Sequence, residues 1–422
     1  MNIDSIIIKK QNNQSLTNME IKFVVENYTK GIIDDFKMTI LLKAICEQGM
    51  TEDETIILTK EMVNSGEIID LSGVEGRIID KHSTGGVGDK VTLVVAPLVA
   101  AAGVPVAKMS GKALGFTGGT IDKLESIPGL KTNLTIEEFI NQVNNIGVAI
   151  SSTAINVAPA DKKIYALRDI TDTVKSIPLI ASSIMSKKLA SGASKIVLDV
   201  KVGKGAMIKD LQSAEKLAKL MVKIGNSAGK ETIAILSNMN NPLGYSIGNT
   251  LEVKETIDIL LLKGEKRITE LCIVIAATMI QLGKNMSFDK AKEEINNLLV
   301  SKKGYQKFSE LIISQKGEIN NIASSKSKVN VKSNEAGYVS GIDTEALGKY
   351  VMELGAGRKT KESKIDYTAG IILNKKVGDY IEGGELLLTI HTNKPEVADI
   401  LNIFTFSKTK PTLEPMIFKV IK

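Results

Sequence analysis

Short runs of β-branched residues alternate with longer apolar segments through the middle of this chain, and this alternation constrains the fold more than any other feature. The runs expected to be strands span residues 76–80, 104–109, 148–150, 196–200 and 232–236. Strands that alternate with helices of about ten or more residues are typical of a parallel α/β sheet. Because ligands bind beyond the carboxyl ends of such strands, a site is expected in the segments that follow these runs.

Helical patterns dominate the first 65 residues. Thr17 is positioned to cap one helix, residues 34–48 have the spacing of a second, and Thr51 with Glu54 forms a capping box for a third. A chain of 422 residues is too long for one compact core, so we expect two or three domains. The first of them is a small helical domain.

The last quarter of the chain changes character twice. Residues 314–333 are rich in Ser, Lys and Asn and only weakly patterned, which indicates a linker. In the region 334–422, strand-like runs alternate with glycine-containing turns, and residues 347–354 have helical spacing. This region is expected to form a separate α+β domain.

The charges of the chain are mixed and spread along its length. The net charge is +6, from 54 basic and 48 acidic residues, without a basic cluster interleaved with aromatic side chains. This distribution argues against a nucleic-acid partner and favours a basic pocket for an anionic small molecule. Cys46 and Cys272 have no disulfide or metal spacing, and no apolar stretch approaches membrane-spanning length. We therefore expect a soluble, cytoplasmic protein, with no membrane partner, in a reducing compartment.

The first expected strand ends in a glycine-rich loop, with the sequence KHSTGGVGD at residues 81–89. Glycines let backbone N–H groups converge on an anion, and a following helix adds its dipole. Lys81 and Ser83 add an ammonium group and a hydroxyl. The loop matches neither the Walker A pattern nor the dinucleotide fingerprint. Considered alone, it is equally compatible with an anion site and with a tight structural turn.

A second loop of the same kind follows the next expected strand. Lys108, Met109 and Ser110 precede Gly111, and the sequence TGGT follows at residues 117–120. Two loops at adjacent strand ends, each with ammonium and hydroxyl donors, suit one phosphate held from several sides. The pair therefore favours a phosphate site over two coincidental turns.

A third feature lies in a long helical stretch at 167–190, which Pro178 interrupts. Ser183 and Lys187 are four residues apart and so share one helix face, while Arg168 lies at the start of the stretch. Considered alone, Lys187 is better explained as a solvated lysine beside Lys188.

These three features, in this order and at this spacing, resemble the thymidine and pyrimidine-nucleoside phosphorylase family. The signature around residues 117–125 is highly specific, and the resemblance covers nearly the whole chain. The matching segments are 81–89, 108–125, 158–168, 172–188, 198–205, 241–255 and 354–358.

The resemblance implies an α/β fold class with three parts: a small split helical domain, a mixed, mostly parallel α/β domain, and a C-terminal α+β domain. The helical domain would be assembled from two stretches, because the second would return to pack on the first. The expected boundaries are 1–66 and 160–192 for the helical domain, 67–159 and 193–313 for the α/β phosphate-binding domain, 314–333 for the linker and 334–422 for the C-terminal domain.

The resemblance also implies the reaction. Enzymes of this family cleave the N-glycosidic bond of a pyrimidine nucleoside with phosphate, giving the free base and a pentose 1-phosphate, without an organic cofactor. Negative charge develops on the leaving base, so preorganised cationic and hydrogen-bond donors are the expected catalytic device. No obvious carboxylate pair for glycoside hydrolysis appears, which agrees with phosphate as the nucleophile.

The resemblance assigns roles to individual residues. Arg168, Ser183 and Lys187 would hold the pyrimidine, and with His82, which would lie near the base and sugar, they form the expected catalytic set. The residues expected to bind phosphate are Lys81, His82, Ser83, Thr92, Lys108, Met109, Ser110 and Thr120.

Several relatives also bind a potassium ion behind the first loop, and the resemblance transfers that site to this chain. The matching positions are Gly88, Lys90, Leu243, Ser246 and Glu255. Relatives that hold the ion often have a hydroxyl residue at position 90. Lys90 can still offer its backbone carbonyl, or its ammonium can pair with Glu255 instead. A homodimer through the first helices is implied as well.

The residues Lys112, Phe116 and Met207 depart from the family pattern. Of these, Phe116 and Met207 can reshape the pocket near the base. Two substrate ranges are therefore considered: uridine, thymidine and deoxyuridine together, or thymidine alone.

Three other interpretations have less support. A relative of anthranilate phosphoribosyltransferase would need magnesium and would lack the third domain. A biotinyl- or lipoyl-type carrier module is suggested by residues 377–379 and 383–386, but no attachment lysine is evident. A non-catalytic nucleoside-binding relative would not need every expected contact, and all are present here.

Overall fold

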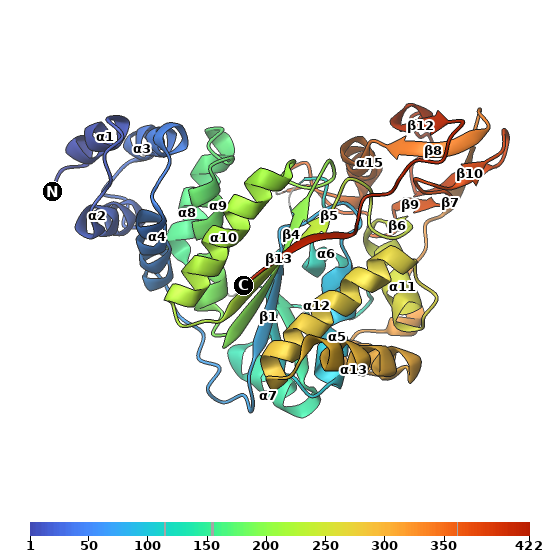
Figure 1. Ribbon diagram of the computed structural model, residues 1–422, viewed down its shortest axis with the longest axis horizontal. Helices are drawn as coiled ribbons and strands as arrows, with labels where there is room; N and C mark the ends of the chain where they lie inside the picture. Colours follow the sequence, from blue (N-terminus) through green and yellow to red (C-terminus); the bar gives the residue numbers. More distant parts are fainter. Residues whose placement is uncertain (114, 153–155, 361) are drawn as a thin grey trace.

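The computed structural model describes residues 1–113, 115–152, 156–360 and 362–422. Position 114, within the matching segment 108–125, lies outside the described residues. Figure 1 shows a helical region around the N-terminus, a central α/β region and a C-terminal region of small sheets. The expected fold class is confirmed.

The helical region is built from two separated stretches of the chain. Its helices are α1 (Ile3–Gln11), α2 (Asn18–Thr29), α3 (Asp35–Gln48), α4 (Glu52–Asn64), α8 (Pro159–Ile170) and α9 (Ile177–Ala190). The caps expected at Thr17 and Thr51 are present, each in a complete capping box. Helices α8 and α9 pack on the earlier helices, and Tyr28, Leu42 and Leu179 share the resulting core.

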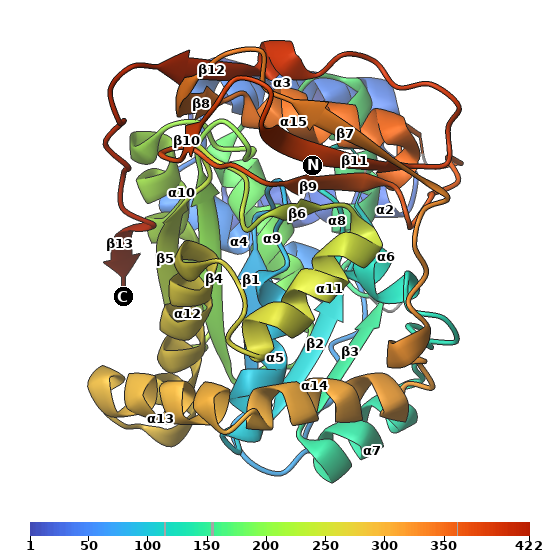
Figure 2. The ribbon, with the colours of Figure 1, turned by 90° about the vertical axis from the view of Figure 1, so that its right-hand side faces the viewer.

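The main sheet has four strands. In spatial order they are β1 (Ile79–Ser83), β4 (Lys195–Val202), β5 (Thr232–Asn238) and β13 (Ile417–Ile421). The first three are parallel, whereas β13 pairs antiparallel with β5. A second parallel pair, β2 (Val106–Ser110) and β3 (Val148–Ser152), lies beside β1 (Figure 2). The carboxyl ends of β1 and β2 are therefore neighbours, and so are the glycine loops that follow them.

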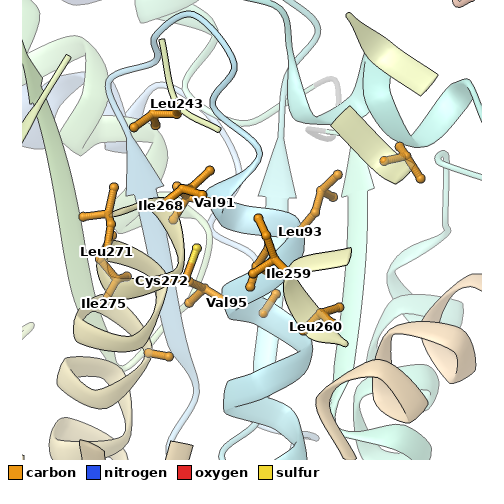
Figure 3. Packing of buried hydrophobic residues seen from close by; sticks show 14 of the residues in the cluster. Val91, Leu93, Val95, Leu243, Ile259, Leu260, Ile268, Leu271, Cys272 and Ile275 are labelled. Atoms are coloured by element: carbon orange, nitrogen blue, oxygen red, sulfur yellow. The ribbon is translucent and has the colours of Figure 1, made fainter. Parts of the chain in front are cut away.

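Helices cover both faces of the main sheet. On β4, Ile196 and Leu198 face the core shared with α9 and α10 (Leu211–Ser227), whereas Val197 faces the core shared with α5 (Val91–Ala101) and α12 (Lys266–Lys284). Figure 3 shows side chains of α5 and α12 meeting in that second core. The other helices here are α6 (Thr120–Glu125), α7 (Ile136–Ile146), α11 (Asn249–Leu260), α13 (Phe288–Val300) and α14 (Lys303–Ser314).

The C-terminal region consists of two small antiparallel sheets and short helices. One sheet has the order β6-β9-β11-β7 and the other the order β10-β8-β12. The strands are β6 (Ser246–Ile247), β7 (Ser327–Lys332), β8 (Gly337–Ile342), β9 (Gly370–Leu373), β10 (Tyr380–Ile381), β11 (Leu386–Thr392) and β12 (Phe404–Ser407). The helical segments are α15 (Thr344–Val351), η2 (Met352–Ala356) and η3 (Leu401–Ile403), and η1 (Ile319–Asn321) precedes this region.

The structure differs from the sequence expectations at three points. The expected linker 314–333 contains β7, an edge strand in which only Val329 and Val331 are apolar and most side chains are exposed. Strand β13 leaves the C-terminal region and joins the main sheet. Pro178 does not interrupt one long helix but lies in the first turn of α9, where a missing N–H costs no helical hydrogen bond.

No single helix among the described residues is both long and apolar enough to cross a membrane. The pair α12 and α13, bent by 118°, meets the criterion on length and composition only.

Candidate active site

A cavity of about 540 Å³ lies between the end of β1 and the helices α8 and α9. It joins the glycine-rich loop at residues 81–89, the second loop within residues 108–120, and the helices that carry Arg168, Ser183 and Lys187. The predicted residues that line it are His82, Ser83, Arg168, Ser183 and Lys187, together with Phe116, Thr117, Tyr165 and Met207. A larger hollow, of about 850 Å³, lies near Ile69, Leu71 and Ile224, and none of the predicted site residues lines it. Because the predicted catalytic residues line only the smaller of these two cavities, we take the smaller cavity as the candidate active site.

Lys81 and Ser83 belong to the end of β1 rather than to the loop, since β1 extends to Ser83. The Lys81 ammonium lies 3.3 Å from the Thr92 hydroxyl on α5 and 3.2 Å from the Asp199 carboxylate on β4. Ser83 donates to the Asp89 carboxylate and accepts from the Gly85 N–H at 3.1 Å. The loop is thus held in shape by its own side chains.

The second loop is joined to the first through Asp80. One carboxylate oxygen of Asp80 lies 3.4 Å from the Lys108 ammonium, and the other lies 2.6 Å from that of Lys188 on α9. Lys108 also donates to the Met109 carbonyl at 2.9 Å. The same Met109 carbonyl also accepts from the Lys188 ammonium at 3.4 Å, so Met109 takes part in this network through its main chain. The strand ends and α9 therefore share one network of charges.

Buried carboxylates and ammonium groups continue behind the loops. Lys201 and Asp199 are both fully buried and lie 2.7 Å apart. Burial opposes the charge of Asp89, but Lys201, Lys81 and Lys123 outweigh it and hold the pKa of this carboxyl below its ordinary value. The carboxylate of Asp89 is therefore ionised, and it braces the loop from inside.

Lys108 differs from the other lysines of this network. Burial is the main cause that lowers its pKa, to about 7, and nearby Lys188 and Lys81 lower it further, against the attraction of Asp80. In the protein without an anion, this ammonium is only partly protonated near neutral pH. A bound anion would favour the protonated form.

His82 faces the cavity between these lysines. Burial and then Lys188, Lys108, Lys81 and Lys187 depress the pKa of its imidazole well below the ordinary histidine value. Its Nε2 atom is buried and has no hydrogen-bond partner among the residues that the structure describes. The ring is therefore neutral, with one nitrogen able to donate and the other able to accept.

The helical side of the cavity is organised by Arg168 and Lys187. Three N–H groups of the Arg168 guanidinium donate to the carbonyls of Thr173, Leu179 and Val174, at 3.2, 3.1 and 3.0 Å. A guanidinium has five N–H donors, so two remain for a ligand. The sequence assigned Arg168 only a ligand role, yet it also fixes the turn between α8 and α9.

Lys187 extends from α9 into the cavity. Its ammonium lies 3.0 Å from the Ser183 hydroxyl and contacts the Asp161 carboxylate on α8. The Lys187 side chain is 37% exposed, whereas Asp161 is buried. A reacting molecule can therefore reach the Lys187 ammonium, whereas the Asp161 carboxylate that pairs with it is shielded from solvent.

Two other predicted phosphate residues lie at the second loop. Ser110 ends β2, and Thr120 begins α6, whose N-terminal residue Gly119 provides no side-chain cap. The backbone N–H groups at the start of α6 therefore have no capping side chain. The predicted phosphate residues thus gather at the ends of β1 and β2 and at the starts of α5 and α6.

The positions expected to hold potassium also lie together. The Lys90 ammonium contacts the carbonyls of Leu243 and Ser246 and the carboxylate of Glu255. Gly88 lies against Leu243, because a Cβ atom at position 88 would come within 2.5 Å of the Leu243 carbonyl oxygen.

Sequence reasoning missed the acidic partners Asp80, Asp161 and Asp199 and the buried lysine Lys201. A signal was present for three of them. Asp80, Asp199 and Lys201 are charged residues inside β-branched runs, and a charge in a buried strand has to be paired. Asp161 gave no comparable signal, because a carboxylate in the first turn of a helix is ordinary.

The three departures from the family pattern have different surroundings. Lys112 pairs with Glu125 at 2.8 Å and does not line the cavity. Phe116 and Met207 do line it. These two side chains are therefore able to affect which ligand fits.

Three protein-family models match the chain. The helical bundle domain of a glycosyl transferase family covers residues 4–66, and the a/b domain of the same family covers residues 75–305. The C-terminal domain of pyrimidine nucleoside phosphorylase covers residues 338–405.

Curated relatives match along nearly the whole chain. The pyrimidine-nucleoside phosphorylase of Geobacillus stearothermophilus is 51% identical over 407 residues, which are 95% of this chain and 94% of the relative. That of Bacillus subtilis is 50% identical over 409 residues, with the same shares. That of Staphylococcus haemolyticus is 47% identical over 431 residues, the full length of both chains.

A solved structure of anthranilate phosphoribosyltransferase from Thermus thermophilus is similar in fold. It superposes with a TM-score of 0.59 and 15% identity, over 74% of this chain and 99% of that chain. At this identity the likeness concerns the fold alone.

Proposed function

The chain belongs to the family of the pyrimidine-nucleoside phosphorylases, and on this premise we propose that it cleaves uridine, thymidine and deoxyuridine with phosphate. The products would be the free base and ribose or deoxyribose 1-phosphate. The observation that carries the proposal is the cavity itself, because it joins His82 and Ser83 at the end of β1 to Arg168, Ser183 and Lys187. At about 540 Å³, it has the size of a site for a small molecule.

Phosphate would bind where the two glycine loops meet. Lys81, Ser83 and Thr92 would contribute from β1 and α5, and Lys108, Ser110 and Thr120 from the second loop. The aspartates behind the loops support this role, because they keep the buried lysines in fixed positions before the anion arrives. The neutral His82 would accept or donate a hydrogen bond without adding a further charge.

The base would leave on the helical side of the cavity. As a phosphate oxygen bonds to C1′, the bond from C1′ to N1 of the base breaks, and its electron pair stays on the base. The resulting charge spreads to the ring carbonyls, where the two unused N–H groups of Arg168, the Ser183 hydroxyl and the Lys187 ammonium would receive it. Arg168, Ser183, Lys187 and His82 are the proposed catalytic residues.

The decisive experiment is phosphorolysis by the purified protein. Incubation with uridine and phosphate should release uracil and ribose 1-phosphate in equal amounts, and omission of phosphate should stop the release. Failure to release base, or release that persists without phosphate, would show the proposal to be wrong.

The substrate range is tested by the same assay. Comparable kcat/KM values for uridine, deoxyuridine and thymidine are expected. If only thymidine and deoxyuridine reacted, the 2′-hydroxyl would be excluded, and the chain would act as a thymidine phosphorylase. Phe116→His and Met207→Phe are the variants most able to shift this preference, because both positions line the cavity.

We further propose that two copies associate through the first helices. Ile8, Met19, Ile32 and Phe36 are large apolar side chains that this helical region leaves exposed. Sedimentation should give the mass of a dimer, and Phe36→Asp should weaken it. A monomer at micromolar concentration would contradict this arrangement.

A further inference from the structure

Lys90 is a fully buried lysine whose ammonium is surrounded by oxygen atoms. It stands directly before α5, and its Nζ atom lies 2.8 Å from the Leu243 carbonyl oxygen, 3.0 Å from the Ser246 carbonyl oxygen and 2.8 Å from Oε2 of Glu255. An ammonium group has three N–H donors, and here three acceptors receive them. Its hydrogen bonding is therefore complete.

The oxygen atoms around Lys90 are held in place by the backbone. The Glu255 carboxylate, on α11, accepts from the N–H groups of Tyr245 and Ser246 at 2.6 and 2.8 Å. Gly244 passes so close that a Cβ atom there would come within 2.4 Å of the same carboxylate. The oxygen atoms around Lys90 can pack this closely because glycine occupies positions 88 and 244, where a side chain would collide with Leu243 or Glu255.

Three of the five positions that the family resemblance assigns to potassium, Leu243, Ser246 and Glu255, supply these oxygen atoms. A protonated amine and a potassium ion carry the same charge and are close in size, so both suit a cage of carbonyl and carboxylate oxygens. With the ammonium present, a potassium ion at these atoms would face a second cation across one carboxylate. The residues of this chain therefore do not fit the ion.

The cluster connects the phosphate side of the site to the C-terminal region. Lys90 ends the first glycine loop and starts α5, whereas Ser246 begins β6, which pairs with β9. The Tyr245 carbonyl also accepts from the Leu373 N–H at 2.8 Å. A positive charge at this junction holds together the loop, the turn at 243–246 and the sheet beyond it.

We infer that the Lys90 ammonium is a built-in replacement for a free monovalent cation, and that it makes the loop architecture independent of potassium. Lys90 is a positioning residue, because it acts on phosphate only through the loop that it anchors. The activity arm of the test rests on the proposed phosphorolysis, whereas the stability and binding arms do not.

The test compares the parent protein with Lys90→Ser in potassium chloride and in N-methylglucamine chloride of equal ionic strength. The parent should show the same melting temperature and the same kcat/KM for phosphate in both salts. Lys90→Ser opens a cavity lined by the same oxygens. It should lose about tenfold in kcat/KM without potassium and recover with potassium or rubidium, and its melting temperature should rise with them.

Two controls separate this effect from general damage. Lys90→Met leaves the oxygens without a cation and fills the space, so potassium should not restore it. Lys254→Ser, one residue from Glu255, removes an ammonium that donates hydrogen bonds to Ala323 and Ser324 instead, and this variant should behave as the parent in both salts.

The possible outcomes either support or overturn the role of Lys90 as a replacement for potassium. Saturable activation or stabilisation of the parent by potassium overturns it, and so does a folded Lys90→Ser without a cation response. If Lys90→Ser does not fold, thallium binding to the parent decides: one saturable site per chain overturns the inference, and no site supports it. If no variant performs phosphorolysis, the proposed function fails while the melting curves still test the cation.

Discussion

The two walls of the cavity hold their cations in different ways. On the strand side, Lys81 and Lys108 lie outside the cavity lining, almost fully buried and paired with aspartates on β4 and β1. On the helical side, the Lys187 side chain is more than a third exposed and paired with Asp161 alone. The strand wall places charge inside the core of the protein, whereas the helical wall presents charge on its surface.

This difference separates stability from turnover. A buried ion pair cannot lose one partner without leaving an uncompensated charge in the core. A pair with one partly exposed member, such as Lys187 with Asp161, is screened by solvent and contributes less to folding, but its ammonium can still direct a charge at a reacting group. We therefore expect substitutions on the strand wall to damage folding and phosphate binding together, and those on the helical wall to damage catalysis more than folding.

Lys81→Met should have the largest effect. It removes one partner of the buried Asp199, so we expect the free energy of unfolding to fall by about 3 kcal/mol, together with the loss of saturation by phosphate. Urea denaturation and initial-rate kinetics measure the two. Lys162→Met, at an exposed position of α8, is the matched control. Unchanged stability of Lys81→Met would remove the proposed contrast between the walls.

Lys187→Ala should come next. We expect kcat/KM for the nucleoside to fall by about 10²–10³, because a donor aimed at the leaving base is lost. Because the buried Asp161 loses its ion-pair partner, the urea midpoint should also fall, but by less than that of Lys81→Met. A large loss of stability, or nearly normal turnover, would place Lys187 with the structural lysines instead.

Asp161→Asn tests the same wall through its counter-charge. The neutral isostere keeps the shape but no longer holds the Lys187 ammonium electrostatically, so kcat/KM should fall by about tenfold. Because Asp161 is expected to act only through Lys187, the double variant Asp161→Asn/Lys187→Ala should be no slower than Lys187→Ala. Additive losses would show an independent role for Asp161.

The smallest expected effect is a change of protonation at Lys108. Its pKa of about 7 means that the protein without an anion holds little charge there at pH 8. Sulfate, which remains a dianion in this range, should therefore bind with uptake of between half a proton and one proton. Calorimetry in buffers of different ionisation enthalpy measures this uptake. Lys108→Arg, which stays protonated, should bind sulfate without it.

The lowered pKa of Lys108 also makes the stability of the folded protein depend on pH. Between about pH 7 and the ordinary lysine pKa, the unfolded chain binds more protons at Lys108 than the folded chain does. The contribution of this group to the free energy of unfolding therefore rises with pH across that range. Added sulfate should weaken the trend.

Local sequence patterns predicted helices well where a single strong signal, such as a capping box or a long apolar run, was present. The capping box at Thr51 and Glu54 predicted the start of α4, and the apolar run after Lys90 predicted α5. The extent of β1 was predicted less well. Its last residues, Lys81 to Ser83, are polar, and only pairing with β4 extends the strand through them.

The site depended on long-range contacts that no local pattern contains. The lysines and hydroxyls of the two loops stood out because glycines surround them in the sequence. Their aspartate partners come from other strands and helices, and the pairing of Asp161 with Lys187 spans 26 residues. Strand β7 was missed because its apolar alternation is limited to Val329 and Val331, within a stretch of Ser, Lys and Asn, and a mostly exposed edge strand needs no longer pattern.

Strand β13 has a consequence for the order in which the protein is made. It closes the outer edge of β5, yet every residue from 239 to 416 is synthesised between the two strands. During translation β5 would therefore emerge with an open backbone edge, of the kind that other chains can pair with. The helices that follow β5 cover its face but not this edge, so the central sheet is completed only after the C-terminal region has been synthesised.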